Sequence, residues 1–155
     1  MFKAVAKPLA ASIITQTAAW IAGAFIVYLA YTHEISSGNV PAWFLGGMGI
    51  VVGALNLAFF AWAGRSSKSA GAGLLAGAAV GVAAALWGAF LNFLFMALGG
   101  VKLTVFAAAE MQSYALKFAL LPSPTAEAAV LWTLASLGLG LVFGALFGLL
   151  GGAVK

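Results

Sequence analysis

Three side-chain amides stand inside long apolar stretches, where they are the groups best placed for chemistry: Gln16, Asn56 and Asn92. A helix rises about 1.5 Å per residue, so helices centred near Trp20 and Gly53 put Gln16 and Asn56 roughly 5 Å to the same side of the midplane. These two amides can therefore bond each other between neighbouring helices. Asn92 falls roughly 10 Å to the other side and should not meet Asn56.

Amides at this depth have two interpretations, a polar path for a small solute or hydrogen bonds that hold helices together. Such bonds typically contribute under about 1–2 kcal/mol each. A path for ions or protons usually contains an intramembrane carboxylate, histidine or basic residue, and none falls in the expected spans. The sequence therefore favours the structural interpretation and keeps the solute path as its alternative.

Glu110 is the ionisable side chain whose role depends on how its segment is placed. If residues 102–121 cross the membrane, Glu110 is the leading candidate for a proton or cation site. If the segment lies at the membrane surface, Glu110 belongs to a solvated face. We expect the surface placement.

Metal, cofactor and enzyme chemistry have little support in the sequence. His33 and Glu34 are adjacent, but one histidine beside one carboxylate cannot complete a zinc site. Cysteine is absent, which excludes thiolate ligands and cysteine nucleophiles. No nucleophile stands beside a base, and the glycine-rich stretches match no phosphate-binding motif. We therefore expect no catalytic residue, no metal, no cofactor and no enzymatic activity.

Glycine spacing is the strongest pattern in the chain. Glycines recur every four residues in two stretches, one of three residues and one of four: Gly73, Gly77, Gly81, and Gly140, Gly144, Gly148, Gly152. On a helix this spacing forms a smooth groove that lets another backbone approach closely. The groove predicts either a self-association face or packing of the fourth helix against the third within one chain. Two separate ladders favour an oligomer or a larger complex.

The composition identifies the solvent that these helices face. Of 155 residues, 65% are hydrophobic and 6% are charged, with a mean hydropathy of +1.13. A water-soluble domain needs many more charged groups to cover its surface. Long apolar runs in lipid must be helices, because backbone groups there have to pair within the segment. The seven basic residues are scattered, so nucleic acid is not expected as a partner.

These features predict an all-α integral membrane bundle, a single domain over residues 1–155. Four stretches are long enough to span, at about residues 9–30, 42–63, 72–98 and 126–154. The polar run Arg65-Ser66-Ser67-Lys68-Ser69 predicts a short connection between the second and third spans. Residues 102–121 carry polar and apolar side chains on opposite faces and predict an amphipathic helix in the interface. Five transmembrane helices are the alternative.

Charge placement favours four spans with both termini cytoplasmic. The inner side then holds five basic residues, Lys3, Lys7, Arg65, Lys68 and Lys155. The outer side holds Lys102, Lys117 and all three acidic residues, Glu34, Glu110 and Glu127. A fifth span would send Lys155 outside and bury Glu110.

Taken together, the sequence predicts a small multi-pass protein of the cell membrane, non-catalytic, acting as a subunit of a membrane complex or as a homo-oligomer joined through its glycine faces. The expected partners are the bilayer and either itself or other membrane subunits. The alternative is a small channel or carrier for a neutral or weakly polar solute.

Overall fold

The computed structural model describes residues 2–31, 42–95, 97, 98 and 126–154. Four helices occupy these residues: α1 (Phe2–Tyr31), α2 (Ala42–Arg65), α3 (Ala70–Phe95) and α6 (Ala126–Ala153). The described part contains no strand, which confirms the all-α prediction. The predicted interfacial helix at 102–121, Glu110, and the His33-Glu34 pair lie outside the described residues.

Three stretches are long and apolar enough to cross a membrane: Lys3–Phe25, Ala70–Phe95 and Val130–Ala153. The apolar part of α2 whose side chains are described, Gly49–Arg65, is shorter. Four crossings therefore remain a prediction. The α1 helix begins about seven residues before the predicted span, because a helix can continue beyond the apolar layer while Lys3 and Lys7 stay exposed.

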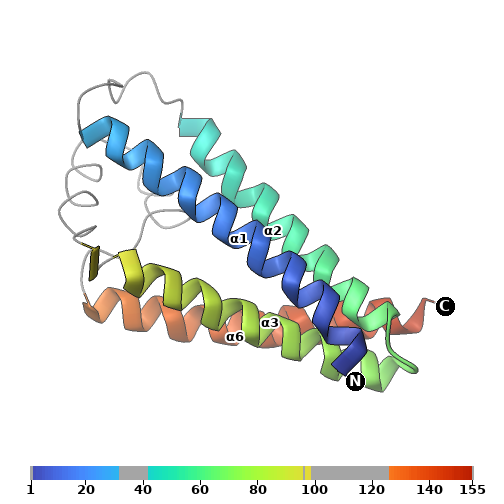
Figure 1. Ribbon diagram of the computed structural model, residues 1–155. Coiled ribbons are helices and arrows are strands. Elements are labelled where there is room, and N and C mark those ends of the chain that lie inside the picture. Colours follow the sequence, from blue (N-terminus) through green and yellow to red (C-terminus); the bar gives the residue numbers. More distant parts are fainter. Residues whose placement is uncertain (1, 32–41, 96, 99–125, 155) are drawn as a thin grey trace.

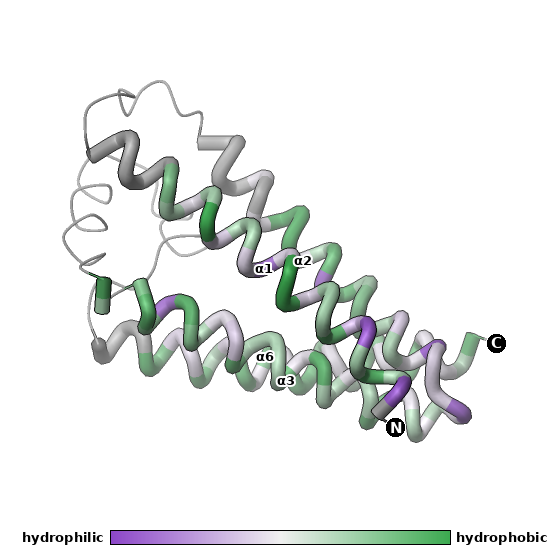
Figure 2. Tube along the Cα trace, in the orientation of Figure 1, coloured by the Kyte–Doolittle hydropathy of each residue, from purple (hydrophilic) through white to green (hydrophobic). Residues whose placement is uncertain are grey.

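The helices form two antiparallel pairs, α1 with α2 and α3 with α6 (Figure 1). The pairs converge at the end that holds both termini and the α2–α3 connection, and they diverge toward the opposite end. Most of each helix is apolar, and hydrophilic residues gather toward the convergent end (Figure 2). The four described basic side chains belong to this end and are exposed: Lys3, Lys7, Arg65 and Lys68.

Glycines bring α3 and α6 into backbone contact. A Cβ added at Gly144 would lie 2.5 Å from the carbonyl oxygen of Gly77, and one added at Gly140 would lie 2.5 Å from that of Gly81. A Cβ at Gly73 would lie 2.6 Å from the carbonyl oxygen of Gly148. Only glycine allows this approach, which permits dispersion and Cα–H···O contacts where lipid supplies no hydrophobic driving force between helices.

Three helices are in contact at the convergent end. The backbone of Gly148 in α6 touches Gly64 of α2 as well as Gly73 of α3. The connection beside it is held by its serines: Ser67 Oγ donates to the Gly64 carbonyl at 2.5 Å, and Ser69 Oγ accepts from the Ala72 amide at 3.2 Å. Ser69 thereby caps the first turn of α3. The two helical pairs are joined firmly here.

Candidate solute-binding cleft

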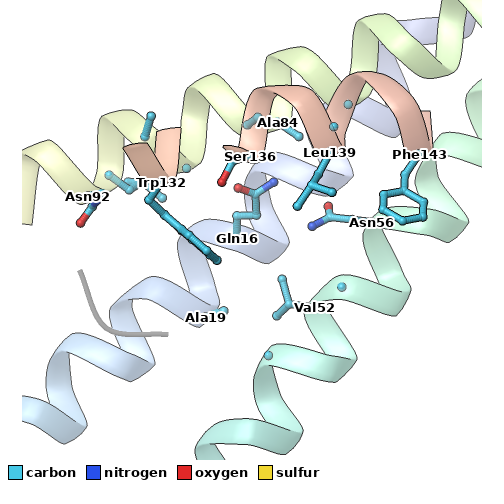
Figure 3. A pocket seen from close by; sticks show the side chains of 18 of the residues that line it. Gln16, Ala19, Val52, Asn56, Ala84, Asn92, Trp132, Ser136, Leu139 and Phe143 are labelled. Carbon is cyan, nitrogen blue, oxygen red and sulfur yellow. The ribbon is translucent and has the colours of Figure 1, made fainter. Parts of the chain in front are cut away.

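A cleft of about 470 Å³ lies between the two helical pairs (Figure 3). All four helices contribute to its wall, and none of the described side chains that line it is charged. Its polar side chains, besides two tryptophans, are Gln16, Asn56, Asn92, Thr133 and Ser136. This volume is in the range of small-molecule sites, which combine apolar walls with a few polar groups.

Ser12 connects two of the amides in a hydrogen-bonded relay. Its side chain is fully buried, and Ser12 Oγ donates to Asn56 Oδ1 at 2.7 Å. Gln16 Nε2 donates in turn to Ser12 Oγ at 3.1 Å. The relay runs from α1 to α2, and it uses one polar atom of each amide while the side chains still line the cleft.

A second polar contact ties α1 to α3. Trp87 Nε1 donates to Thr17 Oγ1 at 2.9 Å, and Thr17 Oγ1 donates to the carbonyl oxygen of Ile13 at 2.8 Å. Neither Thr17 nor Trp87 lines the cleft. This contact is therefore a structural bond between α1 and α3 that lies outside the cleft.

Two buried polar atoms of cleft residues have no hydrogen-bond partner among the described residues. They are the donor Trp20 Nε1 and the acceptor Asn92 Oδ1. The indole of Trp20 packs edge-on against Phe95, with ring centroids 6.1 Å apart. Buried polar groups in native proteins are rarely left unpaired, so such groups call for an explanation.

Glycines shape the cleft on two of its walls. A Cβ added at Gly53 of α2 would meet nothing within 4 Å, so the missing side chain leaves open space in the cleft. A Cβ added at Gly88 of α3 would lie 3.2 Å from Gln16 Oε1. Gly88 therefore leaves room for the amide of Gln16.

The structure brings all three predicted amides to one cleft. Gln16 and Asn56 meet as the depth calculation suggests, but through Ser12 rather than directly. Asn92 lies in the same lining and makes no bond with them. Ser12 and Ser136 were not predicted from the sequence as residues of this site. Ser12 stands four residues before Gln16 and therefore on the same helical face, and that spacing could have identified it.

The predicted glycine ladders meet each other within one chain. The glycines of α3 lie against those of α6 in an antiparallel register, with Gly73 opposite Gly148, Gly77 opposite Gly144, and Gly81 opposite Gly140. This is the packing of the fourth helix on the third that the sequence left open. A second chain could use these faces only after α3 and α6 separate.

Among the described residues, no group of three or more histidine, cysteine or acidic side chains is placed to hold a metal ion. Comparisons with protein families, curated proteins and solved structures found no match to this chain. The fold thus defines a class, an apolar helical bundle compatible with a membrane protein, and the functional argument must come from the cleft.

Proposed function

We propose that this chain is a four-span membrane protein that carries a neutral, weakly polar solute in the cleft between its helical pairs. The observation that carries the proposal is the convergence of three intramembrane amides and Ser136 on one cleft. Amides that served only as helix-to-helix bonds would belong to a closed bundle. The α6 glycine face, which would have joined two copies, is instead occupied by α3.

The uncharged lining of the cleft favours uncharged solutes over ions. An ion entering a site at membrane depth loses its hydration, and no described residue of the lining offers a compensating charge. A neutral molecule with a few polar atoms can replace its bonds to water with bonds to the amides. The cleft therefore favours uncharged solutes and disfavours ions.

The close contacts at the convergent end favour a carrier over a channel. Gly148 of α6 lies in backbone contact with Gly64 of α2 and Gly73 of α3, and none of the three lines the cleft. In the proposed orientation, both termini and the exposed lysines are cytoplasmic, and the cleft opens toward the outer side. Passage of a solute would require the two pairs to separate at their joined end. The chain performs no reaction in this proposal.

The test is solute flux into reconstituted vesicles, followed by stopped-flow light scattering with 1,2-propanediol and with sodium chloride. We expect faster diol entry than into protein-free vesicles and an unchanged salt leak. Gly53→Leu fills the cleft and should abolish the increment. Gly138→Leu is the matched control, because Gly138 does not line the cleft and a Cβ there would meet nothing within 4 Å. Equal diol entry with and without protein would refute the proposal.

A second proposal is that the chain is a non-catalytic subunit of a membrane complex or homo-oligomer. It is supported by glycines that the chain does not use for its own packing, since a Cβ at Gly47 or Gly138 would meet nothing within 4 Å and neither residue is buried. Mass determination after purification in gentle detergent tests this proposal. A mass equal to one chain plus detergent would count against it.

A further inference from the structure

We infer that the cleft recognises an uncharged amphiphile whose head group both donates and accepts a hydrogen bond, as the hydroxyl of a long-chain alcohol does. The inference rests on the proposed function and narrows it from neutral solutes in general to one chemical class. It follows from the hydrogen bonds of Ser12, which use one polar atom of the Gln16 amide and one of the Asn56 amide and leave the other atom of each amide for a ligand.

The two hydrogen bonds of the relay have a defined donor and acceptor. In the order Gln16 Nε2 to Ser12 Oγ to Asn56 Oδ1, the atoms left over are the acceptor Gln16 Oε1 and the donor Asn56 Nδ2. Neither leftover atom has a hydrogen bond with any described residue. A serine hydroxyl has one hydrogen, so turning both amides over would only reverse the relay. One donor and one acceptor would again be left at the cleft.

The two amide side chains lie on the same part of the cleft wall. Figure 3 shows Gln16 and Asn56 pointing into the same space, with Ser136 and Leu139 of α6 facing that space. A hydroxyl placed among them can donate to the free amide oxygen and accept from the free amide nitrogen. A head group that only accepts, such as an ester or ether, would leave the acceptor unpaired.

The cleft has room for more than a head group, and much of its wall is apolar. At about 30 Å³ per water, 470 Å³ corresponds to about 16 water-sized volumes, more than a lone hydroxyl requires. Apolar side chains line much of this space, among them Val52, Leu139 and Phe143. An apolar body attached to the head group fills it favourably. In this inference such a molecule enters between the helical pairs, which diverge away from the end that holds both termini (Figure 1).

The test uses two photoreactive probes that differ only in the head group, a long-chain alcohol and the corresponding hydrocarbon, each with a diazirine in its chain. The full chain in vesicles is irradiated, and labelled residues are mapped by mass spectrometry. We expect the alcohol to label the cleft wall, for example at Val52 and Leu139. Unlabelled decanol should compete at least about tenfold better than decane, a factor equivalent to about 1.4 kcal/mol.

Substitutions in the cleft test whether the preference for decanol over decane depends on the Gln16 and Asn56 amides. Gln16→Leu and Asn56→Leu should each reduce the advantage of decanol over decane. Thr17→Val also removes an intramembrane polar group, but Thr17 does not line the cleft, so it should keep that advantage. The comparison of decanol with decane on the unaltered chain needs no variant and remains informative if a variant fails to fold.

The outcomes separate this inference from the proposed function. Equal competition by decanol and decane, or better competition by the anion decanoate, would overturn the inference. Diol flux that Gly53→Leu abolishes would still support the carrier in that case. If diol entry is unchanged by protein and neither probe labels the cleft wall, both the carrier and its selectivity are refuted.

Discussion

The α3–α6 contact predicts that a single methyl group at Gly144 destabilises the protein. An added Cβ would lie 2.5 Å from the carbonyl oxygen of Gly77, whereas an unstrained C···O contact is about 3.3 Å. The two backbones must therefore separate locally by about 0.8 Å. Inserting extra volume into a well-packed contact costs about 1–3 kcal/mol. Alanine is also the better helix former, by about 0.8–1.0 kcal/mol, which offsets part of this cost.

Gly138→Ala is the matched control on the same helix. A Cβ there meets nothing within 4 Å, so only the gain in helix propensity remains. We expect the free energy of unfolding of Gly144→Ala to be lower than that of Gly138→Ala by about 1–3 kcal/mol. Reversible unfolding in mixed micelles, followed by circular dichroism during titration with dodecyl sulfate, measures the difference. Equal midpoints for the two variants would refute the close approach of α3 and α6.

Four further substitutions test the polar contacts. Ser12→Ala should reduce the free energy of unfolding by about 1–2 kcal/mol, because it removes the relay and leaves a partly buried oxygen of Asn56 unpaired; an unchanged unfolding midpoint would contradict the relay. Trp87→Phe and Thr17→Val, combined in a double-mutant cycle, should give a coupling of about 0.6 kcal/mol; additive effects would argue against that bond. Ser67→Ala should cost about 1 kcal/mol through the α2–α3 connection, measured by the same unfolding assay.

The sequence predicted the helices because long apolar stretches leave strong local signals. The length of the apolar stretches predicts the helices, and the polar run around Ser67 predicts the connection between α2 and α3. The four-residue spacing of glycines gives a face for close packing. The two ladders favoured packing between chains over packing within one chain, although Gly144 has the same spacing in either case. That choice depends on the register of α6 against α3, a tertiary property.

The cleft was only partly predictable for a related reason. Depth along a helix placed Gln16 near Asn56, since the rise per residue is fixed. The angle between the two helical pairs was not available from the sequence. That divergence lets Asn92 share a lining with the other two amides despite its different depth. Ser136 gave no signal by itself, because a lone serine in a membrane helix commonly bonds its own backbone.

The central claim, a cleft that admits neutral polar molecules at membrane depth, is tested most directly by thiol labelling. The chain has no cysteine, so an introduced one is the sole target. Ala89→Cys places a thiol in the cleft lining, and Leu134→Cys places one on an exposed apolar face outside it. A thiol ionises and reacts where water can reach it.

In vesicles, the uncharged reagent N-ethylmaleimide should modify Ala89→Cys faster than Leu134→Cys, and 1,2-propanediol should slow only the reaction of Ala89→Cys. Equal rates, or a faster reaction of Leu134→Cys, would contradict the cleft.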